Sequence, residues 1–307
     1  MNTIHTITIT TLIGIIGFNP SYGAVKSKID SPADRLAYSV ELIEERIEAA
    51  QPIFEIQLNK RVRKFIKSYL QEGKHSTANI LGRSSIYFPI IEKYLEGCQM
   101  PDDLKYLAVI ESALKPTARS ESGAVGLWQF MPITAREYGL RIDDYVDERL
   151  DLYRSTEAAV QFLSTLHQRY QDWALAIAAY NCGPGKVDKV IKKAGSKHFW
   201  SIKKHLPKQT QRYVEKFIAA TYAMDNYIFY DIHPKYPDYS LQLTTTTNIY
   251  TRKSFRQIAK ETGISIQVIQ QLNPTYKKAI IPPNEKGYYL LLPRIGLNND
   301  WKKIINK

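Results

Sequence analysis

Apolar side chains recur every three to four residues through much of the chain, and this spacing constrains the fold more than any other feature. The period is that of an amphipathic α-helix, which turns one face toward a core. It runs through 33–71, 156–170, 187–193 and 209–230, whereas 173–180 is almost wholly apolar and typical of a buried helix. We therefore predict a mainly α protein whose middle part is a helical domain.

One predicted helix ends with a carboxylate in an unusual place. Residues 101–103 (PDD) favour a helix start, and Pro116 blocks continuation, so the helix should end near 112–114. Glu111 then lies in the last turn, where the helix dipole already concentrates negative charge. Helix stability alone therefore does not explain a carboxylate at this position.

The segments around this helix are predicted from the same signals. Residues 84–95 should form a helix that Pro89 kinks or delays. Residues 117–127 are small and polar with two glycines and should form a loop, after which 128–138 becomes helical again. We expect Trp128 to belong to the core.

The composition changes after Ile232. Residues 233–244 hold two prolines without helical spacing and are predicted to be a linker. Residues 245–293 follow a β-α-α-β pattern of about 50 residues, a unit too small to stabilise itself generously. The tail, 294–307, has no clear pattern.

The first residues indicate export. Residues 7–18 are uncharged and mostly apolar, a stretch of signal-peptide length but too short for a transmembrane span. Cleavage after Gly23 would make 1–23 a signal peptide and 24–95 a helical N-terminal extension of a domain at 96–232. The first six residues lack Lys and Arg, so a short membrane anchor or a buried strand is the alternative. We expect the periplasm or cell envelope as the location.

Net charge and cysteine content limit the kinds of binding partner and bound group that the chain is expected to have. The chain carries 42 basic and 30 acidic residues, a net charge of +12 spread along its length. This indicates attraction to an anionic cell wall or membrane surface, with possible peripheral envelope association, and not a nucleic-acid motif. Cys98 and Cys182 leave a disulfide open, and the scattered histidines predict neither a metal site nor a cofactor.

Glu111 is the candidate catalytic residue. Cleavage of a glycosidic bond needs a carboxylic acid whose pKa is raised so that the acid persists near neutral pH. Burial at an apolar helix end would raise the pKa of Glu111 in this way. Most such enzymes use a second carboxylate, yet Glu121 lies in the loop, and Asp143, Asp144 and Asp147 are expected at the surface. A mechanism with a single carboxylate fits these residues.

Three ordered motifs resemble the soluble lytic transglycosylases, a goose-lysozyme-like family. They are 111–140 (ESALKPTARSESGAVGLWQFMPITAREYGL), 178–185 (AAYNCGPG) and 206–214 (LPKQTQRYV). The likeness covers roughly 96–225 and is strongest to membrane-bound murein transglycosylases of the D type, whose lead-in resembles 83–89 (RSSIYFP). It implies a lysozyme-like helical domain. It also implies cleavage of peptidoglycan between N-acetylmuramic acid and N-acetylglucosamine by Glu111, leaving 1,6-anhydro ends.

The resemblance also assigns roles in the loop that follows Glu111. Ser120 would hydrogen-bond near the acid or the substrate, and Gln129 and Met131 would line the cleft. A turn residue, a helix-surface residue and ordinary packing are the respective alternatives.

The two later motifs add three more site residues. Tyr180 would orient Glu111, Asn181 would shape the site beside it, and Tyr213 would complete the opposite wall. A core position is the alternative for both tyrosines. The chain departs from the family pattern at Cys182, where a small residue is usual, and at Gln209, where Glu is common.

The C-terminal unit resembles a LysM carbohydrate-binding module. Residues 255–274 and 288–293 fit, but Arg252-Lys253-Ser254-Phe255 replaces the usual Gly-Asp-Thr-Leu. Glycan binding and a docking or structural role therefore stay open for this unit. For the whole chain we expect a monomeric enzyme acting on peptidoglycan strands. The alternatives are a lysozyme-like hydrolase and an inactive wall-binding protein.

Overall fold

The computed structural model describes Val40–Arg294, which fall into two units divided after Ala49. The described part of the first unit is one helix, α2 (Val40–Ala49). The predicted signal peptide and the residues beyond Arg294 lie outside the described residues. Within that range, no helix combines the length and apolarity that a membrane crossing requires.

The second unit begins with a segment that breaks the predicted long helix. Residues 50–59 are not helical, because Gln51 has a left-handed φ of 51° and is followed by Pro52. Asn59 then caps α3 (Lys60–Lys67) by accepting hydrogen bonds from two backbone amides of the first turn. The prediction of a single helix over 33–71 is therefore wrong at its centre.

The helix predicted over 84–95 is much longer. A π-helical turn, η1 (Ser68–Glu72), leads into α4 (Lys74–Gly97), which contains Pro89 in its interior. Proline removes one helical hydrogen bond at a cost of about 3 kcal/mol. The buried face of α4 includes Ile80, Ile91 and Leu95, so packing offsets that cost.

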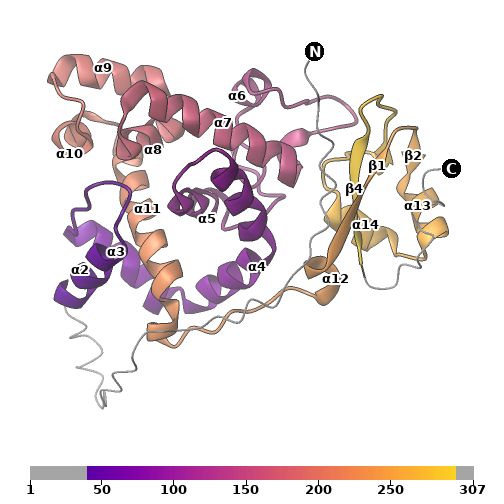
Figure 1. The fold of residues 1–307 in the computed structure, drawn as a ribbon, viewed down its shortest axis with the longest axis horizontal. Coiled ribbons are helices and arrows are strands. Elements are labelled where there is room, and N and C mark those ends of the chain that lie inside the picture. The colour runs from indigo at the N-terminus through magenta and orange to yellow at the C-terminus, as the bar shows by residue number, and fades with distance from the viewer. Residues whose placement is uncertain (1–39, 295–307) are drawn as a thin grey trace. The chain divides into compact units, whose positions relative to one another are not determined.

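Helix α11 (Lys208–Asn226) runs through the centre of the domain and packs on α3, α5 and α8 (Figure 1). Its apolar residues and all of Ala174–Ala179 of α8 are buried, as predicted for 173–180. The remaining elements of the domain are η2 (Asp102–Lys105), α5 (Tyr106–Ser112), α6 (Pro132–Glu137), η3 (Glu148–Leu150), α7 (Leu152–Tyr170), α8 (Trp173–Cys182), α9 (Pro184–Ala194), α10 (Phe199–Ile202), η4 (Lys203–His205) and η5 (Tyr227–Tyr230).

The chain returns from η5 across α4 before the C-terminal module begins. The Lys235 amide donates to the Ala78 carbonyl at 2.8 Å. A Cβ atom on Gly82 would lie 1.8 Å from the Lys235 carbonyl oxygen, so this crossing requires glycine. The short helix α12 (Tyr239–Gln242) follows.

The C-terminal module pairs two short antiparallel ladders with two helices. Strand β1 (Thr244–Ile249) pairs with β4 (Tyr288–Pro293), and β2 (Lys253–Ser254) pairs with β3 (Ile280–Ile281). Between them lie α13 (Phe255–Thr262) and α14 (Ile266–Leu272). Ser254 and Gln257 form a capping box at α13, so Ser254 serves as the N-cap in the altered loop. The structure thus confirms a mainly α chain with a small β-α-α-β module.

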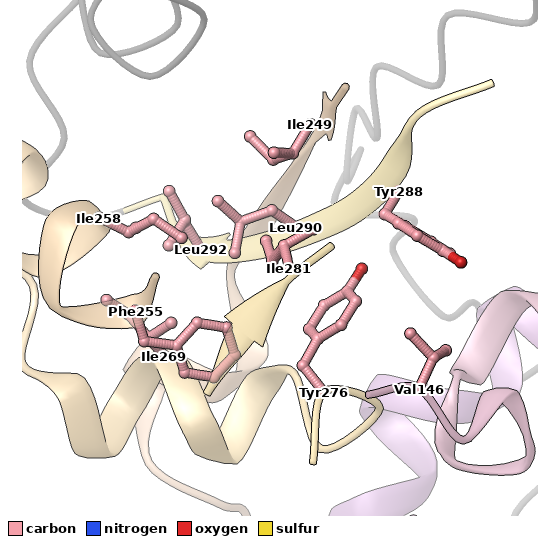
Figure 2. Close-up of a cluster of buried hydrophobic side chains, with 10 residues drawn as sticks. All are labelled: Val146, Ile249, Phe255, Ile258, Ile269, Tyr276, Ile281, Tyr288, Leu290 and Leu292. Atoms are coloured by element: carbon pink, nitrogen blue, oxygen red, sulfur yellow. The ribbon is translucent and has the colours of Figure 1, made fainter. Parts of the chain in front are cut away.

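The core of this module includes a residue from the helical domain. Figure 2 shows Val146 beside Tyr276 and Tyr288, and Val146 is fully buried in this cluster. Backbone hydrogen bonds flank it, from the Asp147 amide to the Thr275 carbonyl at 3.0 Å and from the Lys277 amide to the Tyr145 carbonyl at 2.9 Å. The helical domain thereby supplies apolar contact that the small module lacks.

Candidate active site

Glu111 lies in the last turn of α5, as predicted, and the end of that helix is tightly fixed. Ala113 and Leu114 both have left-handed φ values, 52° and 57°, and their amides donate to carbonyls of α5. Left-handed backbone is uncommon for residues other than glycine, so surrounding contacts must hold it. Arg83 of α4 supplies one such contact by donating from Nε to the Ala113 carbonyl at 3.0 Å.

The Glu111 carboxyl receives one side-chain hydrogen bond. Tyr213 of α11 donates from its hydroxyl to Oε1 of Glu111 at 2.5 Å. Burial raises the pKa of Glu111 to about 7, while the hydrogen bond from Tyr213 and the positive charge of Lys216 act in the opposite direction. A substantial fraction of Glu111 is therefore protonated at neutral pH, as a general acid requires.

A pocket of about 440 Å³ opens beside this carboxyl. Glu111 is the only carboxylate among the described residues that line it. Four lining residues share one face of α11 at helical spacing, namely Gln209, Arg212, Tyr213 and Lys216. The sequence analysis missed the two cations of this face, although Arg212 and Lys216 follow Gln209 at intervals of three and seven.

Asn181 lines this pocket, whereas Tyr180 does not. Asn181 accepts a hydrogen bond from the Thr210 hydroxyl at 3.0 Å, which links the end of α8 to α11. The Tyr180 hydroxyl donates to the Trp128 carbonyl at 2.9 Å. Tyr180 was expected to orient Glu111, and the hydrogen bond to this acid comes from Tyr213. The charge of Glu111 helps to raise the pKa of Tyr180 above its usual value.

The loop residues expected at the site do not line the pocket. The Ser120 hydroxyl accepts from the Ala124 amide at 2.9 Å and closes a turn. Gln129 has a left-handed φ of 50° and donates to the Gly126 carbonyl at 2.8 Å, so it lies in a turn before α6. Met131 is 43% exposed at the start of α6. The helix predicted over 128–138 is therefore limited to its second half, while Trp128 is fully buried, as expected.

A buried ion pair holds this loop in place through hydrogen bonds to the backbone. Arg149 is 6% exposed, pairs with Asp147 at 2.8 Å, and donates to the carbonyls of Gly123 and Phe130. A Cβ atom on Gly126 would lie 1.9 Å from the Arg149 carbonyl oxygen, and Gly126 has a φ of 89°. Asp147, expected at the surface, is 1% exposed because it neutralises Arg149.

The two cysteines are free thiols. Cys98 is exposed at the end of α4, and Cys182 is partly buried at the end of α8. Cys182 therefore belongs to the same helix end as Asn181, but the pocket does not include it.

Two parts of the chain match known families. Residues 89–203 match the transglycosylase SLT domain, and residues 244–296 match the LysM-like domain of lytic transglycosylase MltD. The chain therefore carries a transglycosylase SLT domain followed by an MltD-type LysM-like domain. Glu111 and Asn181 lie within the first matched range, whereas Tyr213 lies beyond it.

The chain is also similar to individual proteins named as lytic murein transglycosylases. The chain is 31% identical over 238 residues to membrane-bound lytic murein transglycosylase D of Escherichia coli K12, an alignment covering 76% of this chain and 52% of that protein. It is 32% identical over 144 residues to membrane-bound lytic murein transglycosylase F of Shewanella pealeana, covering 42% of this chain and 28% of that protein. The chain thus spans about half the length of the first of these relatives.

A solved structure is also similar over part of the chain. The 70 kDa soluble lytic transglycosylase of Escherichia coli aligns with 48% of this chain and 25% of its own, at 26% identity and a TM-score of 0.39.

Proposed function

We propose that this protein is a peptidoglycan lytic transglycosylase that uses Glu111 as its only catalytic acid and base. The observation that carries the proposal is the position of Glu111, half-buried in the pocket and hydrogen-bonded to Tyr213, with a pKa raised to about 7. The two family matches support the same activity.

The proposed reaction needs one proton carrier. Protonated Glu111 gives its proton to the oxygen that bridges N-acetylmuramic acid and N-acetylglucosamine, and the bond from that oxygen to C1 of the muramoyl sugar breaks. The substrate's own N-acetyl group stabilises the positive charge at C1. The muramoyl C6 hydroxyl then attacks C1 and returns a proton to Glu111, so a 1,6-anhydro end forms and no water is consumed.

Hydrolysis is the alternative, and the number of acidic side chains that line the pocket argues against it. Retaining and inverting glycosidases place a second carboxylate about 5 to 9.5 Å from the acid. Among the described residues, Glu111 is the single acidic side chain in the pocket wall. An intramolecular hydroxyl nucleophile removes the need for such a partner.

The activity is tested by digesting purified sacculi and weighing the released muropeptides by mass spectrometry. A transglycosylase product is lighter by one water per cut than a hydrolase product. Glu111→Gln should lower the release by at least about 100-fold, because general acid catalysis contributes on that order. Glu121→Gln, a change in the exposed loop, is the matched control and should act like the wild type. Products that carry the additional water would indicate a hydrolase instead.

We also propose the place and organisation of this activity. Residues 1–23 would direct the export of the chain. The basic protein would then act as a monomer on glycan strands in the periplasm or cell envelope. The helical domain at 96–232 would hold the reaction, and 24–95 would form its extension. The module at 245–293 would follow the linker at 233–244. The relative named as membrane-bound murein transglycosylase D supports an envelope location.

A further inference from the structure

A second pocket lies beside another face of α11 and carries an excess of positive charge. Its volume is about 620 Å³. Residues before and within α3 form one side, and residues from α10 through α11 form the other, the lining set being Asn59, Lys60, Arg61, Lys64, Trp200, Lys203, Lys204, Gln211 and Glu215. We call this pocket the basic groove. Five of its side chains are cations and one is a carboxylate.

The single carboxylate is already neutralised. Glu215 is 1% exposed, and it accepts from Arg61 at 3.0 Å, from Lys203 at 2.5 Å and from the Asn59 amide at 3.0 Å. These contacts join α3 to α11 and leave three exposed lysines, Lys60, Lys64 and Lys204. None of the three has an ion pair within Val40–Arg294. Like charges gathered without partners favour an anionic ligand.

An aromatic side chain gives the groove a rigid wall. The Trp200 indole donates to the Glu55 carbonyl at 2.8 Å, and Lys203 Nζ lies 4.6 Å from the centre of its ring. These contacts fix the ring on both its edge and one face. The groove therefore combines a flat apolar surface with cations, which suits an organic anion with a carbon skeleton better than a bare ion.

The basic groove and the catalytic pocket share α11 as a wall. Gln211 lines the groove and Arg212 lines the catalytic pocket, and consecutive helical residues project about 100° apart. The exposed Arg212 lies between the two, so positive charge continues from one to the other. On the surface of a helix about 10 Å across, a step of about 100° is an arc of roughly 9 Å, and an extended peptide of four residues spans up to about 14 Å. A short peptide attached to a sugar in the catalytic pocket can therefore reach the groove.

We propose that the basic groove binds the carboxylates of the stem peptide borne by the glycan strand that occupies the catalytic pocket. This inference rests on the proposed function, because it takes peptidoglycan as the substrate. The stem is attached through the muramoyl lactyl group, and its free carboxylates match Lys60, Lys64 and Lys204. The groove would thus select strands that still carry their peptides.

The test compares two triple variants of the full chain on two substrates. Lys60, Lys64 and Lys204 are changed to Glu in the first. Lys67, Lys192 and Lys193, which are exposed and do not line the groove, are changed to Glu in the matched control. Both variants change the net charge equally. Each is assayed for KM on glycan strands with stem peptides and on strands from which an amidase has removed the peptides.

We expect the groove variant to raise the KM roughly tenfold for peptide-bearing strands, since losing about 1.4 kcal/mol of binding has that effect. The KM for peptide-free strands should not change, and the control should act like the wild type on both. An equal loss in both triple variants, or an equal loss on both substrates, would overturn the proposal. Wild-type protein that releases no anhydro ends from peptide-bearing strands would instead refute the proposed function.

A second measurement needs no variant. Chemical amidation of the stem carboxylates should raise the wild-type KM to the value of the groove variant, because the ligand's charge is removed while its shape is kept. An unchanged KM overturns the proposal. So does a groove variant that loses binding to phosphatidylglycerol vesicles but keeps its KM for peptide-bearing strands, since the groove would then be a membrane site.

Discussion

At the scale of single residues, Tyr213 controls the proton affinity of Glu111. Its hydroxyl donates to the carboxylate and favours the charged form, so it lowers a pKa that burial raises. A hydrogen bond to a charged group contributes about 1.5–3 kcal/mol, which corresponds to roughly 1–2 pKa units. We expect Tyr213→Phe to raise the pKa of Glu111 and to move the alkaline limb of kcat/KM to higher pH by up to that amount. Rates on soluble glycan strands across a pH series measure it.

Tyr180→Phe is the matched control for this shift. Its hydroxyl donates to the Trp128 carbonyl and not to Glu111, so the alkaline limb should stay where it is in the wild type. If Tyr213→Phe left the limb in place, or Tyr180→Phe moved it equally, the hydrogen bond would not set the proton affinity of Glu111.

The sequence motifs predicted the position of the acid, Glu111, more accurately than the side chains that surround it. Glu111, Asn181 and Tyr213 come together in the pocket although they lie far apart in the chain. Which tyrosine reaches the acid depends on how α8 and α11 pack, and this tertiary geometry cannot be read from a motif. The cations of α11 were predictable, because Arg212 and Lys216 follow Gln209 at intervals of three and seven.

At the scale of elements, helical spacing in the sequence did not locate every point at which a helix breaks or continues. Helical spacing continued through 33–71, but Pro52 and the left-handed Gln51 interrupt it. At Pro89 the opposite happened: proline was expected to kink or delay the helix, but α4 continues through it because its buried face is well packed. Helices with strong amphipathic or wholly apolar patterns, α7 and α8, were predicted with only small shifts of their ends.

The C-terminal module depends on one side chain that local sequence could not assign to it. Val146 is fully buried in its core, and the removal of two methyl groups costs about 1–3 kcal/mol. We expect Val146→Ala to destabilise β4 and α14 selectively, because they pack in that core. Hydrogen–deuterium exchange of their amides should become faster, while amides of α8 keep their wild-type protection.

Ile133→Ala provides the control for this effect. Ile133 is 73% exposed on α6, so its truncation removes a comparable side chain without opening a core. Equal exchange of β4 in Val146→Ala and wild-type protein would show that the module is stable without this contact.

At the scale of the whole molecule, the acid that is proposed to act in catalysis lowers the stability of the fold. The pKa of Glu111 is about 7 in the folded chain and 4.5 for an ordinary glutamate, so the folded state holds its proton more tightly. The unfolded chain loses that proton as pH rises above 4.5, and folding stability falls until pH passes 7. Above that pH the full difference applies, about 1–3 kcal/mol after allowance for partial exposure.

Glu111→Gln lacks this titration. The variant should therefore be more stable than the wild type by a margin that grows with pH. Its advantage in the free energy of unfolding, measured in urea, should be about 1–3 kcal/mol larger at pH 8 than at pH 4. The exposed Glu121→Gln should show no such pH-dependent gain. A constant difference between Glu111→Gln and wild type across this range would mean that burial does not raise the proton affinity of Glu111, and the raised pKa would then no longer support its role as the general acid.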